Sequence, residues 1–418
     1  MAPLIARHAT PVAARRLARS PALIIEGARQ VGKSTLAQQI ADEDAVHVTL
    51  DDEQVRDAAR EDPEGFVMQG GGQQLVIDEL QRMPALTLAL KSAIDRDRRP
   101  GRFIVTGSAS LLSVRGTADS LAGRAARLRL HGFSQGELLQ QQDDLVHSVR
   151  TLGLDQFARS TGTHTRTGYS AIISAGSFPE ASGFAERDRA EWIDDYLQAV
   201  VTRDLPDLRR EVRPARAMAL LRALSGRQSS ELVLARLAAE VDIPRTTLPA
   251  YLDLLRDVGL ITTVPPWTPN LAKREIGRQK TVVLDSAVAT RLARVTRDQL
   301  RSIPYGEALG SFLESWVTAE LLKQQTWSRE EFELFHYRDR DGLEVDLVIE
   351  LADGGVIAIE VKASSSYSAK QFLGLKKLRD ALGERFIGGI VLGTSEGGYR
   401  FADRLVGAPI SVLWEPAP

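Results

Sequence analysis

Short apolar runs, separated by stretches of helical pattern, occupy the first third of the chain. The runs lie at residues 22–25, 46–50, 75–77 and 102–108, and a last one at 126–130 alternates arginine with apolar residues. Strands that alternate with helices predict a parallel α/β sheet. Ligands of such sheets bind beyond the carboxyl ends of the strands, so the residues that follow each run are the first candidates for a site.

The first run leads into Gly27-Ala28-Arg29-Gln30-Val31-Gly32-Lys33-Ser34-Thr35, which a helical pattern follows. Glycines at both ends let the backbone fold around a polyphosphate with its N–H groups pointing inward. Lys33 would reach the β- and γ-phosphates, and Ser34 would bind Mg²⁺. The alternative, an ordinary glycine-rich turn, rarely has this spacing between a strand and a helix. The segment therefore predicts an ATP or GTP site.

The run at 75–77 ends in Asp78-Glu79. Asp78 can hold the magnesium shell, and Glu79 can polarise a water molecule against the γ-phosphate. An acidic pair that caps the next helix is the simpler alternative. Because a phosphate loop precedes the pair at a suitable distance, we expect Lys33, Asp78 and Glu79 to form one hydrolytic site.

Three further side chains are candidates for contact with the nucleotide. Thr106 and Ser108 end the run at 102–108 and could sense the γ-phosphate or the attacking water, or could equally cap the next helix. Arg124 precedes the last run and could touch a γ-phosphate, although surface arginines are commonly only solvated.

Length and composition limit the number of cores and the classes of site and partner that the protein can have. With 418 residues, 43% of them hydrophobic, the chain can bury two or three cores. It has no cysteine, which agrees with a reducing cytoplasm, and its six histidines lack metal-ligand spacing. No apolar run approaches the ~20 residues that a bilayer requires, so no membrane partner is expected. The net charge of −2 neither favours nor excludes nucleic acid.

The middle of the chain changes character in steps. Residues 137–168 are polar with little pattern, which indicates a connection or a poorly ordered excursion. A helical region runs to about residue 225, with Trp192, Tyr196 and Val200 on one face. Residues 232–265 then follow the pattern of a winged helix-turn-helix.

Two alternatives remain for this winged segment. Its second helix could read DNA with Arg245 and Thr247 facing outward, or the module could serve in packing or protein contacts. The arginines just before it favour a surface that binds phosphate backbones: Arg209, Arg210, Arg213, Arg216 and Arg222.

A second constellation lies near the C-terminus, where strands at 343–349 and 356–362 flank a tight turn. A turn centred on Asp353 pairs residues whose numbers sum to 706, which are Asp346 with Glu360 and Glu344 with Lys362. Asp346, Glu360 and Lys362 would then share one face, backed by Glu314 from a helix. Such a group can hold Mg²⁺ and stabilise a phosphodiester under attack. A cross-strand salt bridge on a solvated face is an equally good interpretation.

These motifs, with Leu75–Gln81, Thr106-Gly107-Ser108, Leu121-Ala122-Gly123-Arg124 and Phe178-Pro179-Glu180, resemble the prokaryotic AAA-type ATPases that carry a C-terminal domain of unknown function. The resemblance covers nearly the whole chain. It implies a C-terminal domain similar to the PD-(D/E)XK nucleases, with Asp346, Glu360-Val361-Lys362 and Glu314 at the motif positions. It also implies a central winged helix and assembly into a ring or dimer.

The expected fold is therefore α/β, with a P-loop ATPase core at 1–136, a helical lid and connector at 137–225, a winged helix-turn-helix at 226–300 and a PD-(D/E)XK nuclease-like domain at 301–418. We expect a cytoplasmic, Mg²⁺-dependent ATPase coupled to a domain that binds, and in one version cleaves, DNA or RNA. The alternative is an ATP-driven regulatory or scaffold protein whose nuclease-like domain binds a partner without cutting it.

Overall fold

The computed structural model describes residues 4–108, 121–269 and 277–415, and the chain forms two compact units. The first unit comprises Met1–Phe133 with Leu252–Leu260, and the second comprises Ser134–Tyr251 with Ile261–Pro418. The parts of the four predicted domains that fall at 1–3, 109–120, 270–276 and 416–418 lie outside the described residues. The boundaries predicted at 225 and 300 stay predictions.

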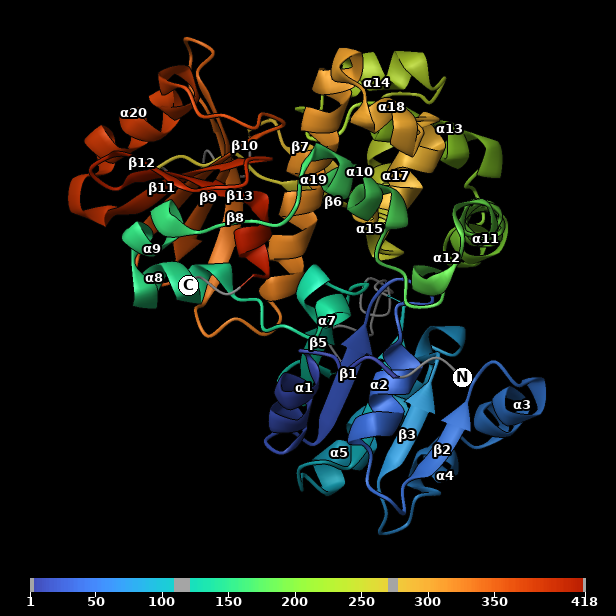
Figure 1. The fold of residues 1–418 in the computed structure, drawn as a ribbon. Helices are drawn as coiled ribbons and strands as arrows, with labels where there is room; N and C mark the ends of the chain where they lie inside the picture. Colours follow the sequence, from blue (N-terminus) through green and yellow to red (C-terminus); the bar gives the residue numbers. More distant parts are fainter. Residues whose placement is uncertain (1–3, 109–120, 270–276, 416–418) are drawn as a thin grey trace. The chain divides into compact units, whose positions relative to one another are not determined.

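The first unit contains the predicted parallel sheet, with strand order β2-β3-β4-β1-β5 (Figure 1). Every neighbouring pair in it is parallel. Its strands and helices are β1 (Ala22–Glu26), β2 (Val46–Thr49), β3 (Leu75–Asp78), β4 (Phe103–Gly107), β5 (Ala125–Arg129), α1 (Thr10–Leu17), α2 (Lys33–Ile40), α3 (Glu53–Glu61), α4 (Pro63–Met68) and α5 (Leu86–Arg96).

Alternation along the strands divides the core of this unit into two layers, because successive strand residues face opposite sides of a sheet. Ala22 and Ile24 of β1 share one core with Phe103 and Val105 of β4, and this face packs on α3, α4 and α5. The intervening residues, such as Leu23, are also fully buried, and helices α1 and α2 contact the strands β1 and β4. The strands are thus covered on both faces, as a parallel sheet requires.

The middle of the chain is helical. Its elements are α7 (Gln135–Leu139), α8 (Leu145–Leu152), α9 (Leu154–Arg159), α10 (Arg166–Ala175), α11 (Glu186–Ala199), a π-helical turn (Val200–Asp204), α12 (Leu205–Leu208) and α13 (Pro214–Ser225). Of the two interpretations offered for 137–168, the poorly ordered excursion was wrong. Short helices occupy much of it, and they are anchored by a few buried apolar side chains, including Val149 and Phe157. Leu145 and Val149 of α8 do lie at helical spacing, but the helix spans only eight residues, which is short for a pattern to be recognised.

The segment predicted as a winged helix-turn-helix contains two helices followed by a hairpin. Helix α14 (Leu234–Glu240) precedes α15 (Leu248–Asp257), and β6 (Ile261–Val264) pairs antiparallel with β7 (Lys280–Val283). Helices α17 (Ser286–Ala293) and α18 (Arg297–Arg301) follow. Arg245 and Thr247 are exposed, as predicted.

The C-terminal part is a mixed sheet of order β12-β13-β11-β10-β9-β8 (Figure 1). Its elements are α19 (Gly306–Gln324), β8 (Phe332–Arg338), β9 (Glu344–Leu351), β10 (Val356–Lys362), α20 (Leu373–Leu382), β11 (Phe386–Gly393), β12 (Tyr399–Ala402) and β13 (Leu405–Pro409). Helix α20 shares a core with Val348 and Ala358 of the sheet, whereas α19 contacts β10. The strands that carry the predicted carboxylates therefore lie in the interior of the sheet.

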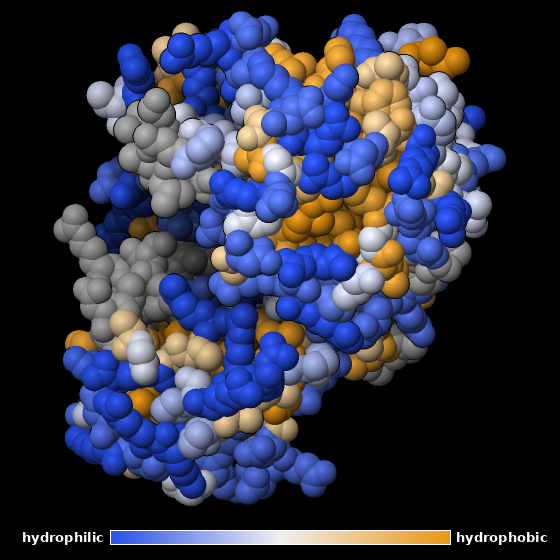
Figure 2. All heavy atoms as spheres, turned by 90° about the vertical axis from the view of Figure 1, so that its left-hand side faces the viewer, coloured by the Kyte–Doolittle hydropathy of each residue, from blue (hydrophilic) through white to orange (hydrophobic). Residues whose placement is uncertain are grey.

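Hydrophilic side chains dominate the face of the molecule that Figure 2 shows, and hydrophobic ones gather there in patches. None of the helices within the described ranges combines the length and the apolar composition needed to cross a bilayer.

Candidate functional site

The phosphate loop of the first unit has the backbone path that its glycines predict. A Cβ atom at Gly27 would lie 2.2 Å from the carbonyl oxygen of Leu130, and Gly32 adopts a φ of +94°. A side chain at position 27 would clash with the backbone, and one at position 32 would be strained. Lys33 is only 5% exposed, and its Nζ donates to the carbonyl oxygen of Ala28 at 2.9 Å. The lysine is thus held within the loop that it would serve.

The carboxyl ends of β3 and β4 bring the remaining predicted polar groups to this loop. The Ser34 hydroxyl donates to the Asp78 carboxylate at 2.8 and 3.0 Å, and the Thr106 hydroxyl donates to Asp78 as well. The backbone N–H of Glu79 donates to Thr106 Oγ1 at 3.2 Å. The structure therefore brings Lys33, Ser34, Asp78, Glu79 and Thr106 together, within one unit.

The Glu79 backbone is left-handed, with a φ of +61°, which is uncommon for a residue with a side chain. Its carboxylate accepts a hydrogen bond from the Gln81 side-chain amide, whose Oε1 accepts the Ser108 N–H at 3.1 Å. Strained backbone held by surrounding contacts is common at functional sites. Gln81 thus orients Glu79, a role that its place in the sequence did not suggest.

Arg7 is a further residue that sequence reasoning missed. It is 7% exposed, and it donates to the carbonyl oxygens of Val31 at 2.9 Å and His131 at 2.6 Å. These bonds tie the phosphate loop to the chain that follows β5. No motif surrounds Arg7, and its partners are 24 and 124 residues away, so no local signal could have identified it.

The segment Leu252–Leu260 also contacts the phosphate loop. A Cβ atom at Gly259, whose φ is +74°, would lie 3.0 Å from the Ala28 Cβ and 3.1 Å from the Ala28 nitrogen. The close approach requires glycine at this position. The nucleotide loop therefore has a direct neighbour from the end of the predicted helix-turn-helix.

Arg124 lies elsewhere. It directly precedes β5, so it is at the amino end of its strand, opposite the edge where the phosphate loop begins. Its guanidinium binds both oxygens of Asp95 at 2.9 and 2.8 Å. We therefore leave Arg124 out of the nucleotide site.

In the second unit, the predicted hairpin has the predicted register. Ile357 pairs with Ile349 and Ile359 with Leu347, so the paired numbers sum to 706. Glu344, however, does not meet Lys362. It ends the ladder with β8 instead, where its carboxylate binds Arg338 at 2.7 Å.

Asp346, Glu360 and Lys362 converge, as predicted. The Lys362 Nζ lies 2.6 Å from Glu360 Oε1 and 3.5 Å from Asp346 Oδ2. The backbone N–H of Val361 donates to Asp346 Oδ2 at 2.8 Å. Asp346 is 6% exposed, so the group is not a salt bridge on a solvated face.

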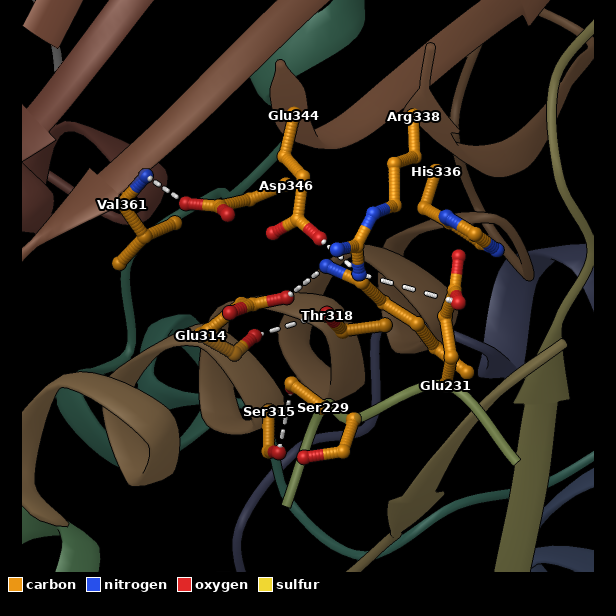
Figure 3. A network of polar contacts seen from close by, with 12 residues as sticks. Ser229, Glu231, Glu314, Ser315, Thr318, His336, Arg338, Glu344, Asp346 and Val361 are labelled. Atoms are coloured by element: carbon orange, nitrogen blue, oxygen red, sulfur yellow. Dashed lines mark hydrogen bonds and ion pairs between the residues drawn. The ribbon is translucent and has the colours of Figure 1, made fainter. Parts of the chain in front are cut away.

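Glu314 joins this group from α19, together with a lysine that sequence reasoning missed (Figure 3). Lys280, the first residue of β7, is 5% exposed, and its Nζ lies 2.7 Å from Glu314 Oε1. We refer to Glu314, Asp346, Glu360, Lys280 and Lys362 as the carboxylate cluster. Lys280 comes from a hairpin 34 residues before Glu314, which is why spacing did not reveal it.

Burial shifts the pKa values of the cluster. It raises the pKa values of both glutamates, Asp346 adds to the rise, and the neighbouring lysines oppose it, which leaves Glu314 at about 8 and Glu360 at about 7. Burial lowers the pKa of Lys362, but attraction from Asp346 and Glu360 outweighs it and leaves the pKa raised. Near neutral pH, Glu314 therefore holds a proton more readily than Glu360, which is close to its titration midpoint, and an entering cation would displace such protons.

The cluster has close carboxylates but not an assembled cage for a metal. Within the described ranges, no three His, Asp or Glu side chains are grouped closely enough to hold a metal ion. Asp346 and Glu360 supply oxygen ligands of the kind that Mg²⁺ prefers, but the Lys362 ammonium already contacts both. The carboxylate oxygens are suitable ligands for a hard divalent cation. In this structure, however, lysine ammonium groups already balance part of their charge.

A cavity of about 470 Å³ in the same unit adjoins the cluster through Arg338. Its lining includes Trp267, Arg278, His336, Arg338 and Glu231. Burial lowers the pKa of His336 to about 4, so the imidazole is neutral near pH 7, and its Nε2 lies 2.9 Å from the Arg278 carbonyl oxygen. The cavity combines two cationic side chains with apolar surface.

Comparison with known protein families divides the chain into three matches. Residues 19–139 match the model of the AAA domain, residues 166–299 match a domain of unknown function, DUF8612, and residues 309–413 match another, DUF4143. The first unit thus carries an AAA-type ATPase domain, a fold that supports ATP binding and hydrolysis.

Relatives of similar sequence do not indicate an activity for this chain. Uncharacterized proteins of Mycobacterium tuberculosis and Mycobacterium bovis are each 29% identical over 357 residues, which is 85% of this chain and 73% of theirs. Among solved structures, AMPPCP-bound DnaA of Aquifex aeolicus is 12% identical, with a TM-score of 0.29 over 59% of this chain and 85% of that one. A RuvB variant of Thermotoga maritima is 21% identical, with a TM-score of 0.29 over 62% and 86%. Scores this low support no inference.

Proposed function

We propose that this chain is a Mg²⁺-dependent ATPase that couples ATP binding and hydrolysis to a C-terminal domain that binds nucleic acid and cleaves its phosphodiester bonds. The observation that supports it is the convergence of Glu314, Asp346, Glu360 and Lys362 in one largely buried cluster of the second unit. Buried charges are costly, so an ordinary hairpin has little reason to keep them there.

In the AAA domain, the loop Gly27–Thr35 would wrap the polyphosphate, with Lys33 against the β- and γ-phosphates. Ser34 and Asp78, which already share hydrogen bonds, would hold Mg²⁺. Glu79 would act as the general base for the attacking water, with Thr106 and Gln81 fixing its position.

In the C-terminal domain, Asp346 and Glu360 would hold a divalent ion, which would activate water and polarise the phosphodiester. Attack of this water on phosphorus breaks one P–O bond, and the departing alcohol takes up a proton. Lys362 would stabilise the negative charge that develops on the phosphorane oxygens. Glu314 would orient the group from the opposite side.

The middle segment would bring nucleic acid to this site. Its hairpin β6–β7 follows two helices, and Arg245 and Thr247 are exposed at the start of the second one. Arg213 and Arg222 are exposed nearby in the sequence, whereas Arg216 lies 3.4 Å from Asp242. Binding through such arginines depends on phosphate charge, so the affinity should fall steeply with salt and weaken on charge reversal at Arg213 and Arg245.

The test is cleavage by the full-length protein of labelled single-stranded, duplex and branched DNA and RNA in Mg²⁺ or Mn²⁺. We expect metal-dependent cleavage that Glu360→Ala and Lys362→Ala abolish. Glu350→Ala is the matched control, because Glu350 lies on the same hairpin but binds Arg385 at 3.1 Å. Wild-type protein that cleaves none of these substrates would contradict the nuclease proposal.

A second function is favoured by the lysines of the cluster. Because Lys280 and Lys362 already compensate the carboxylates, the domain could be an ATP-driven regulatory or scaffold module that binds a partner without cutting it. Partner binding that survives Glu360→Ala, without cleavage by the wild type, would support this alternative.

A further inference from the structure

Lys280 reaches the carboxylate cluster from outside the C-terminal sheet. It is the first residue of β7, paired with Val264 of β6, and it belongs to the segment 166–299 rather than to 309–413. Its side chain is 7% exposed and ends 2.7 Å from Glu314 Oε1. A second contact holds the same two segments together, since the hydroxyls of Ser229 and Ser315 lie 2.8 Å apart.

The groups that face Lys280 are mostly acidic. Glu314, Asp346 and Glu344 all attract its ammonium, and the neighbouring His336 is deprotonated. Glu344 is itself bound to Arg338 and Asp346 lies near Lys362, which leaves Glu314 as the carboxylate that Lys280 contacts directly. A buried lysine in this position carries the charge that a bound cation would otherwise supply.

The two lysines of the cluster differ in whether they could leave it, and the net charge of the cluster shows what would follow. When all are ionised, three carboxylates with both ammonium groups leave the cluster with one negative charge. If Lys280 withdraws, the cluster with Lys362 alone carries two, which matches one divalent cation. Lys362 lies on the same strand as Glu360 and cannot leave without it, whereas Lys280 belongs to a separate hairpin.

We infer that Lys280 is an internal cation that competes with a divalent metal ion for Glu314, so that the β6–β7 hairpin controls whether the carboxylate cluster can bind metal. The inference rests on the proposed metal-binding role of Asp346 and Glu360. An ammonium at hydrogen-bond distance both occupies the Glu314 oxygen and repels an incoming dication. Movement of the hairpin would remove both obstacles together.

The test is binding of Mn²⁺ alone, measured by electron paramagnetic resonance and calorimetry, in protein that also carries Lys33→Ala to weaken the nucleotide site. Lys280→Met should bind Mn²⁺ at least about tenfold more tightly than the parent, because a repelling charge is removed. Lys280→Arg keeps the charge and should match the parent. Adding Glu314→Gln to Lys280→Met should remove the gain.

A matched control is Lys323→Met. Lys323 is another buried lysine that pairs with a glutamate of α19, Glu320, at 2.5 Å. Its removal should leave Mn²⁺ affinity unchanged, since it is not in the cluster. Where Lys280→Met fails to fold, Lys280→Gln keeps a hydrogen-bond donor to Glu314 without the charge and should show the same direction of change.

The outcomes separate this inference from the proposed function. If Asp346→Asn abolishes Mn²⁺ binding while Lys280→Met and Lys280→Gln leave the affinity at the parental value or weaken it, the competition by Lys280 is overturned and the metal site stands. If Asp346→Asn has no effect on Mn²⁺ binding in any background, the metal site itself is wrong, and with it the premise of the inference.

Discussion

The nucleotide site and the carboxylate cluster surround their carboxylates with different kinds of hydrogen-bond donor. In the nucleotide site, the Asp78 carboxylate is surrounded by neutral hydroxyl donors, and Lys33 donates to a backbone carbonyl oxygen. In the cluster, each carboxylate lies near an ammonium group of the protein itself. In the first site the contacts described for Asp78 come from neutral hydroxyls, whereas in the second the contacts come from ammonium groups.

This difference indicates how each site would respond to its ligand. A polyphosphate with Mg²⁺ would meet neutral donors at Asp78, because the Ser34 and Thr106 hydroxyls donate to this carboxylate. A metal ion could enter the cluster only by displacing a lysine or a proton. The first site is preorganised for its ligand, and the second is held in a closed state.

The largest effect expected at the preorganised site follows removal of its base. Glu79→Gln should keep Mg·ATP bound but lower kcat for ATP hydrolysis by about a hundredfold, a typical general-base effect. Nucleotide affinity by fluorescence titration and turnover by phosphate release would measure the two separately. Glu64→Gln, which changes a glutamate on α4 that pairs with Arg96, is the control. Turnover at the wild-type rate in Glu79→Gln would show that another group activates the water.

A smaller effect is expected from a variant that weakens the contacts holding the phosphate loop in place but leaves its catalytic side chains unchanged. Arg7→Ala removes the donors to the Val31 and His131 carbonyl oxygens, so the loop should relax and KM for ATP should rise about tenfold. Arg102→Ala is a matched control, because Arg102 is equally buried but donates to the carbonyl oxygens of Ala93 and Asp97. If both variants change KM alike, Arg7 contributes only to general stability.

Sequence reasoning found the parts of both sites whose geometry is set by residues close to one another in the chain. The phosphate loop lies between a strand and a helix that adjoin it in sequence, and a tight turn fixes the register of the 346–360 hairpin. Arg124 lies away from the phosphate loop of its own chain, and its position in the sequence already indicated this. A residue that precedes a parallel strand lies at the edge opposite the ligand.

The residues that were missed are those whose partners are distant in sequence. Arg7 contacts His131 across 124 residues, and Lys280 contacts Glu314 from another segment. Neither has a local motif, because their roles depend on packing between elements rather than on spacing within one. The part of the compensation that Lys280 supplies was therefore invisible from the sequence, whereas the carboxylates and Lys362 were not.

The smallest effect tests whether the cluster is strained by its own buried charge. Burial raises the pKa of Glu314 to about 8 from an ordinary value of 4.5, so the folded protein binds a proton that the unfolded chain has released between these values. Stability must then fall as pH rises through this window.

Glu314→Gln removes this titration, so its apparent melting temperature should fall less than that of the wild type between about pH 5 and pH 8, by a few degrees. Calorimetry of both proteins, with Glu307→Gln in the first turn of the same helix as control, measures the difference. Parallel pH profiles for the wild type and Glu314→Gln would mean that Lys280 keeps Glu314 ionised throughout, and the contrast between a preorganised site and a strained one would then be lost.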